Sequence, residues 1–154
     1  MPEITSAIEI AHWKQVTKTI TFTGAAGAGE VGTVTVFTVA GRVFVNRITA
    51  YCTTLLDEAL ATATIALGTA GDTDGFIGAT NAVDLDALEW WTAASPVVGS
   101  KSPLKVETGG LVTGQIDKMV SEDIIITVGA QNVDAGVIVF DVWYDPITSG
   151  GSLS

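Results

Sequence analysis

Apolar and polar residues alternate with a period of two at the start of the chain. In the segment 15–23, QVTKTITFT, the residues Val16, Ile20 and Phe22 fall on one parity and threonines fall on the other. A period of two places successive side chains on opposite faces of a sheet. The segment therefore predicts a strand with one buried face.

Two longer apolar segments follow, 33–39 and 42–54, and both are rich in β-branched and aromatic residues. Only Ala40-Gly41 separates them, so we expect a hairpin. Shorter candidate strands are bounded by clusters of turn residues. These strands are 62–67, 104–107, 111–116, 123–128 and 137–144.

The segment 81–91 is the one candidate helix. Asn81 is a capping residue type, and Ala82, Leu85 and Leu88 would share one helical face. An irregular loop would use the same residues.

About eight short strands without long intervening helices predict an all-β, jelly-roll-like antiparallel sandwich. A chain of 154 residues fits one domain with a substantial core. We expect an N-terminal arm at 1–13, the β-sandwich domain at 14–146 and a flexible C-terminal tail at 147–154, because the tail contains the sequence TSGGS.

The composition is apolar for a chain without a spanning segment. Hydrophobic residues make up 47% of the chain and charged residues only 16%. No run approaches the roughly 18 apolar residues that a membrane-spanning helix needs, so we expect no membrane partner. The excess of apolar surface instead indicates contacts with other protein.

The charge pattern excludes a simple nucleic-acid binder. Seventeen Asp and Glu stand against seven Lys and Arg, which gives a formal net charge of −10 and repels phosphate. A single cysteine cannot form an internal disulfide. Because Glu3 stands where a secretory signal would be basic, we expect the chain to be made and kept in the cytoplasm.

Two loops resemble ligand-binding motifs without completing them. The sequence 27–32 fits G-x-G-x-x-G, but a strand follows it where a dinucleotide site needs a helix, so we interpret it as a hairpin loop. Asp72-Thr73-Asp74-Gly75 resembles part of a calcium loop, yet its glycine comes too early and Val83 occupies the position of the bidentate glutamate. We therefore expect no metal and no cofactor.

Candidate catalytic groups are equally incomplete. His12 is the only histidine and falls in the expected arm, and Cys52 falls in a strand, where a buried thiol is inert. The acidic pairs Asp84 with Asp86 and Glu122 with Asp123 are typical of solvated turns, although a glycosidase would also use two carboxylates. We expect the protein not to be an enzyme.

Aromatic and aliphatic residues mark two candidate interfaces. Trp90 and Trp91 are consecutive, so both cannot point to the same sheet face, and an exposed one would serve sugar stacking or a subunit contact. The alternative is that one covers the core edge and the other a loop. In the arm, apolar anchors stand between polar residues and would seat on a partner. They are Ile4, Ile8, Ile10 and Trp13.

Three stretches together resemble a family of small bacteriophage virion proteins, the jelly-roll head decoration or cement proteins. They are GTAGDTDGFI at 68–77, DLDALEWW at 84–91 with Ser95-Pro96, and VFDVWYDPI at 139–147 with its glycine-rich tail. The resemblance covers roughly residues 20–150. It implies a homotrimer that binds the major capsid protein on the capsid exterior of the virion, after assembly in the host cytoplasm, and stabilises the shell.

A second hypothesis is a carbohydrate-binding or adhesive jelly-roll module of a phage tail or fibre, with Trp90 and Trp91 as stacking platforms. An enzyme of unknown type is the third.

Overall fold

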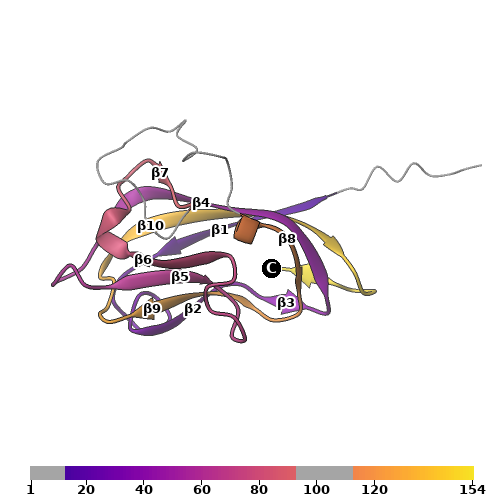
Figure 1. Ribbon diagram of the computed structural model, residues 1–154, viewed down its shortest axis with the longest axis horizontal. Coiled ribbons are helices and arrows are strands. Elements are labelled where there is room, and N and C mark those ends of the chain that lie inside the picture. Colours follow the sequence, from indigo (N-terminus) through magenta and orange to yellow (C-terminus); the bar gives the residue numbers. More distant parts are fainter. Residues whose placement is uncertain (1–12, 93–112) are drawn as a thin grey trace, which may run out of the picture.

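The computed structural model describes residues 13–92 and 113–154, and they form two antiparallel β-sheets that face each other (Figure 1). The first sheet has the order β1 (Lys14–Thr21), β10 (Ala135–Pro146), β4 (Val43–Asp57) and β7 (Glu89–Trp90), and β8 (Ile116–Val120) also pairs with β4. The second has the order β2 (Gly32–Phe37), β9 (Ile124–Gly129), β5 (Thr64–Gly68) and β6 (Ile77–Asn81). A separate short pair joins β3 (Val39–Ala40) to β11 (Ser152–Leu153).

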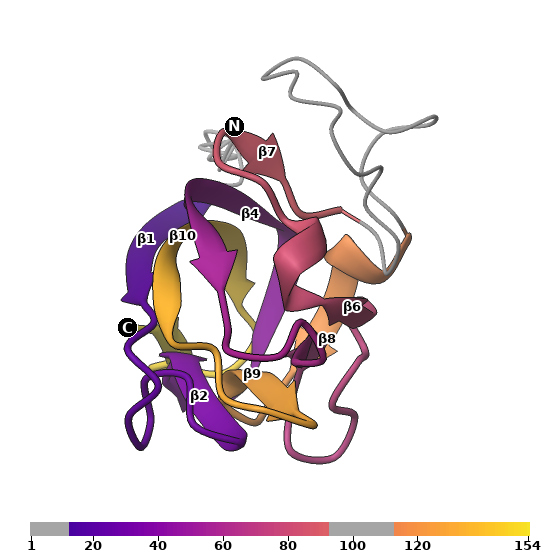
Figure 2. The ribbon, with the colours of Figure 1, turned by 90° about the vertical axis from the view of Figure 1, so that its left-hand side faces the viewer.

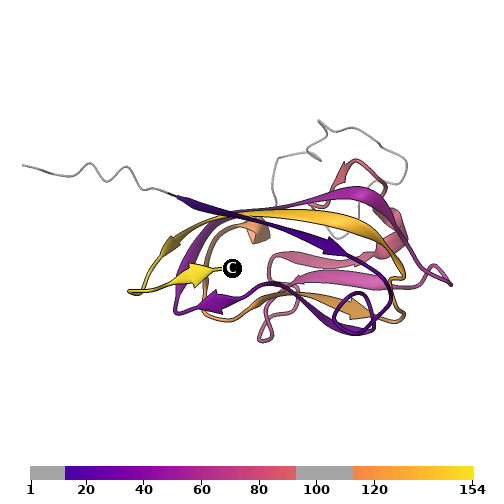
Figure 3. The same ribbon diagram turned by 180° about the vertical axis from the view of Figure 1, so that it is seen from behind.

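The chain passes repeatedly from one sheet to the other, as Figure 2 shows end-on. Of the strands in the two larger sheets, only β5 with β6 are consecutive and paired with each other in one sheet. All other pairings in these sheets join strands that are distant in sequence. Figure 3 shows β1 and β2 running along the same side of the sandwich, where each is an edge strand.

The core lies between the sheets and follows from the alternation in the longest strand. In β4, Val43, Val45, Ile48, Ala50 and Cys52 are buried, while the residues between them are half-buried or exposed. The break in parity after Val45 coincides with a register shift between β4 and β10, which is the signature of a β-bulge. These side chains pack in one cluster with buried residues of the opposite sheet.

The predicted all-β antiparallel sandwich is confirmed. The predicted hairpin between 33–39 and 42–54 is wrong, because β2 pairs with β9 whereas β4 pairs with β10. The residues between β2 and β4 carry the chain from one sheet to the other and form β3 on the way. Both segments are strands, but a short linker alone did not specify their partners.

The predicted helix over 81–91 is also wrong. Residues Ala82–Asp84 form a single 3-10 turn, and Glu89–Trp90 form β7. Leu88, in the connection between them, has a φ of 69°, which an α-helix does not allow. No helix in the described ranges 13–92 and 113–154 is long and apolar enough to cross a membrane.

The C-terminal segment 147–154 differs from the expected flexible tail. Leu153 is buried, and Ser152–Leu153 pair with β3 as strand β11. The backbone amides of Thr38 and Ser154 each donate to the other residue's carbonyl oxygen, at 2.9 and 3.1 Å. The glycines of this segment form the turn that leads into β11. They therefore belong to an ordered turn and not to a flexible tail.

Two of the predicted strands lie wholly or partly between the described ranges 13–92 and 113–154. The strand 104–107 lies outside the described residues, as do positions 111 and 112 of the strand 111–116. The described part of the latter is a 3-10 turn at Thr113–Gln115 that leads directly into β8. The pattern missed β8 because its sequence, IDKMV, has charged residues at consecutive positions.

Candidate functional site

Trp90 and Trp91 point in opposite directions. Trp91 is fully buried, and its indole Nε1 donates a hydrogen bond of 2.9 Å to Oγ1 of Thr80 on β6. Trp90 instead packs against Tyr51, with 4.7 Å between the ring centroids. The prediction that Trp91 is an interface residue is therefore corrected, because its fully buried side chain cannot contact a partner.

The outward side of the first sheet gathers three of the four tryptophans in the chain, Trp13, Trp90 and Trp143. Trp143 lies between Val142 and Tyr144, which are both buried, so its own side chain faces outward. Tyr51 and Phe44 alternate in the same way along β4. We call these five aromatic residues, together with Arg47, the outer face.

Polar groups lie among these rings. The guanidinium of Arg47 sits 4.0 Å from the ring centroid of Trp143, which is a cation–π geometry. In the neighbouring row, the Asp141 carboxylate accepts hydrogen bonds from Gln15 Nε2, at 3.2 Å, and from the Thr17 hydroxyl. Aromatic residues and arginine are enriched at the centres of protein interfaces.

Only one of the four predicted anchors of the arm is described. Ile4, Ile8 and Ile10 lie outside the described residues, and so does His12. Trp13 is 42% exposed, and its ring centroid lies 6.4 Å from that of Phe44. Trp13 therefore continues the outer face to the point where the described chain begins.

The loop with the G-x-G-x-x-G sequence leads into the strand β2. It connects β1 with β2, which lie in different sheets, so it is not the hairpin loop that we expected. Gly29 is closely packed, since a Cβ atom there would lie 2.1 Å from the Val133 carbonyl oxygen. The Val133 amide donates a 2.8 Å hydrogen bond to the Gly29 carbonyl, so the glycine serves packing.

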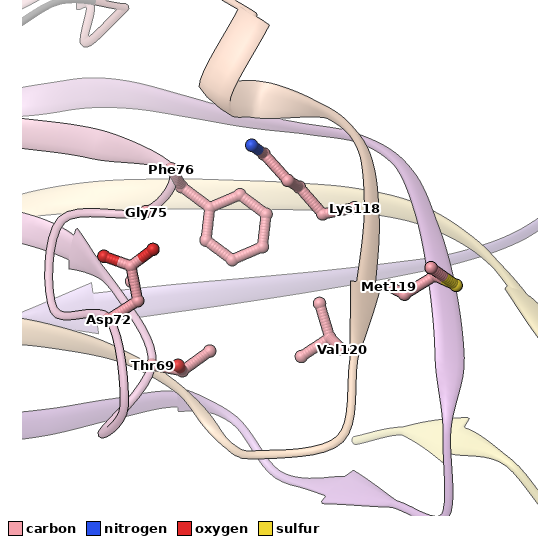
Figure 4. Close-up of a pocket in the computed structure, with 8 residues that line it drawn as sticks. Thr69, Asp72, Gly75, Phe76, Lys118, Met119 and Val120 are labelled. Carbon is pink, nitrogen blue, oxygen red and sulfur yellow. The ribbon is translucent and has the colours of Figure 1, made fainter.

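A pocket of about 150 Å³ lies between the β5–β6 loop and β8 (Figure 4). The Phe76 ring stands in its middle, with the Asp72 carboxylate on one side and Lys118 on the other. This is the loop that resembles part of a calcium site. In the described part of the chain, no group of three or more His, Cys, Asp or Glu side chains is placed to hold a metal.

We expect EDTA to leave the melting temperature unchanged, because hydrogen bonds already fix this loop. The Thr69 amide donates to the Asp72 carbonyl at 2.8 Å, and the Gly71 amide donates to Glu122 Oε2 at 2.9 Å. Differential scanning calorimetry with and without EDTA tests this. A lower melting temperature that calcium restores would contradict it and assign a metal to Asp72 and Asp74.

Three carboxylates of the two acidic pairs, those of Asp84, Glu122 and Asp123, accept hydrogen bonds. Asp123 accepts a 2.9 Å hydrogen bond from the Val39 amide, while its neighbour Glu122 holds the β5–β6 loop. Asp84 accepts a 3.3 Å hydrogen bond from Asn81 Nδ2. In these contacts the three carboxylates hold neighbouring segments in place, whereas the sequence favoured carboxylates that are simply solvated in turns.

Cys52 is a buried strand residue, as expected. Burial is the main cause that raises the pKa of its thiol to about 11, the nearby Glu89 carboxylate acts in the same direction, and hydrogen bonding to the Thr54 and Leu56 backbone opposes them. We expect no reaction of the folded protein with Ellman's reagent at pH 8 and full reaction in denaturant. Rapid labelling of the folded chain would contradict the buried position.

The raised pKa of Cys52 also sets a sign for stability against pH. The folded state keeps its thiol proton to a higher pH than the unfolded state, whose thiol has the ordinary pKa of 9.0. The buried thiol therefore makes its full contribution to the free energy of unfolding below pH 9, and this contribution is lost as the pH rises towards 11.

The sequence pattern did not predict several of the exposed residues. Met119 and Leu60 are 81% and 73% exposed, the highest values among the large apolar residues that the structure describes. Arg47 and Trp143 come together only through the pairing of β4 with β10. The one local signal was the outward parity of Trp143, between Val142 and Tyr144 in the last strand.

No protein-family model matches the sequence, and no curated protein matches it. Among solved structures, a chain of the "Cyanophage Pam1 capsid asymmetric unit" matches with a TM-score of 0.40 and 15% sequence identity. The match covers 88% of this chain and 86% of that chain. A similarity at this level does not assign a family.

Proposed function

We propose that this chain is a structural virion protein that binds the outside of a phage capsid and stabilises it. The observation that carries the proposal is the outer face, where tryptophans, Tyr51 and Arg47 occupy outward positions of an antiparallel sheet. The solvated side of such a sheet is ordinarily polar. Trp, Tyr and Arg are also the residues that dominate binding energy at protein interfaces.

Two other features support a structural role. The sequence resembles head decoration proteins in the three stretches given above. Among the candidate catalytic residues, Cys52 is buried, and Asp84 and Asp123 accept hydrogen bonds from neighbouring residues. The proposal includes no catalysis and no cofactor. It assigns the major capsid protein as the partner and a homotrimer as the bound form.

Co-sedimentation with capsids tests the proposal. The test uses particles of a phage that encodes this chain, stripped of the protein, and compares the wild type with Trp143→Ala and Tyr51→Ala. Loss of an aromatic hot spot costs about 2 kcal/mol or more, which weakens binding roughly 30-fold. Val31→Ala, an exposed change in the β1–β2 connection, is the matched control and should bind like the wild type. Absence of wild-type binding would refute the proposal.

The arm is expected to contribute to attachment. Deleting residues 2–12 should leave the circular dichroism spectrum near that of the wild type and weaken capsid binding or trimer formation. Unchanged binding would restrict the contacts to the sandwich itself.

A glycan-binding module of a tail or fibre is the second candidate. The rings of the outer face lie beside Asp141, Gln15 and Thr17, which can hydrogen-bond a sugar. The burial of Trp91 removes half of the stacking pair on which this hypothesis first rested. A glycan array with the purified chain distinguishes the two functions, because the capsid proposal expects no bound glycan.

A further inference from the structure

The two most exposed large apolar side chains lie at opposite ends of the sandwich. Met119 is on β8 opposite Phe44, near the start of β4, whereas Leu60 follows the end of β4 at Asp57. The 15 residues of β4 separate these ends by about 45 Å. Figure 1 draws the β4–β5 connection, which carries Leu60, as a projection from one end.

The end that carries Met119 is hollow and includes the cationic side chain of Arg42, and we call its residues Arg42, Met119 and Ile147 the Arg42 end. These three residues line a pocket of about 130 Å³ together with Val120 and Ser121. The Ile147 amide donates a 2.9 Å hydrogen bond to the Arg42 carbonyl, which fixes the rim. A cavity of about 150 Å³ accepts a group as large as benzene, so this pocket has space for one aliphatic side chain.

The opposite end projects and is acidic, and we call its residues Leu55, Asp57, Leu60 and Asp134 the Leu60 end. The Asp134 amide donates a 2.8 Å hydrogen bond to the Asp57 carbonyl, which places these two exposed acidic residues side by side. The described lysines and arginines all lie elsewhere, on β1, at the start of β4 and on β8. This end therefore presents carboxylates beside exposed leucines.

The loop that presents Leu60 is fixed before any partner binds. The buried Glu58 carboxylate accepts hydrogen bonds from the amides of Thr62, at 2.9 Å, and Ala63. A loop whose backbone is already ordered loses less conformational entropy on docking than a loop that must first become ordered.

From this complementarity we infer that copies of the chain associate head to tail. Leu60 of one copy occupies the pocket at the Arg42 end of the next copy. Asp57 and Asp134 of the first copy then face Arg42 of the second. A head-to-tail contact uses two different surfaces and forms a ring when its rotation closes. The inference deepens the proposed homotrimer by naming its contact, and the capsid takes no part in it.

The test mixes two variants of the isolated chain, each with one end blocked. Met119→Glu blocks the Arg42 end and Leu60→Glu blocks the Leu60 end, and both positions are exposed enough to tolerate the change. Light scattering should show an oligomer for the wild type and a monomer of 15.9 kDa for each variant alone. An equimolar mixture should give a heterodimer with twice that mass, because one intact end remains on each variant.

Leu88→Glu is the matched control, since Leu88 is 55% exposed beside β7 and outside both ends. It should keep the wild-type mass. A contact between two like ends would leave one variant self-associated and the mixture without a heterodimer, which overturns the inference. A wild-type chain that stays monomeric at about 1 mM, above the dissociation constant of even weak specific complexes, overturns it too.

Failure of this test leaves capsid binding by the outer face unaffected, because no capsid is present. A chain that assembles as described but does not bind particles counts against the proposed function alone.

Discussion

Replacing Trp91 with alanine is expected to lower the free energy of unfolding by about 3–5 kcal/mol, as for other large buried aromatic residues. The indole is fully buried, and its loss leaves both a cavity and a Thr80 hydroxyl without the indole donor. Trp90→Ala, the adjacent change of the same size, should cost less than half as much, because Trp90 is only half-buried against Tyr51. Urea unfolding followed by circular dichroism gives both values.

The comparison of neighbours makes this prediction specific. Equal losses at the two positions, or a larger loss for Trp90→Ala, would mean that Trp91 does not occupy the core between the sheets.

Gly136→Ala is expected to destabilise the fold by about 2–6 kcal/mol, the combined cost of a strained backbone and an overpacked site. Gly136 has a φ of 117° at a register shift between β10 and β4. A Cβ atom there would lie 2.5 Å from Leu56 Cδ2 and 2.7 Å from the Leu55 carbonyl oxygen. Neither the residue's conformation nor its surroundings accept a side chain.

Gly27→Ala separates these two causes. Gly27 also has a positive φ, 70°, but a Cβ atom there meets nothing within 4 Å. This variant should lose only about 1–2 kcal/mol, the cost of left-handed backbone in a non-glycine residue. Thermal unfolding of the two variants measures the difference. Losses of equal size would show that the close approach of β4 to Gly136 is absent.

The sequence was sufficient to predict the strands in which apolar and polar residues alternate. It was insufficient to predict which strands pair with each other. The alternation in 15–23 and in 137–144 predicts β1 and β10, because each strand buries one face. Pairing depends on contacts between distant residues, so Ala40-Gly41 suggested a hairpin where the chain changes sheets. The short strand β11 gave no signal, since two residues have no period and only Leu153 is buried.

The candidate surfaces were harder to predict than the strands. Consecutive Trp90 and Trp91 predicted opposite directions, but the sequence did not say which ring would be buried. The answer depends on the pairing of β7 with β4, which turns Trp90 towards Tyr51. The pocket at Arg42 combines residues that are far apart in sequence, 42, 119 and 147, and no local pattern connects them.

Electron cryo-microscopy of particles from a phage that encodes this chain tests the central claim most directly. The account predicts density for the sandwich on the outer surface of the shell, with the outer face of the β1–β10–β4 sheet turned towards the major capsid protein. A shell without this density, or the chain located on the tail, would contradict it.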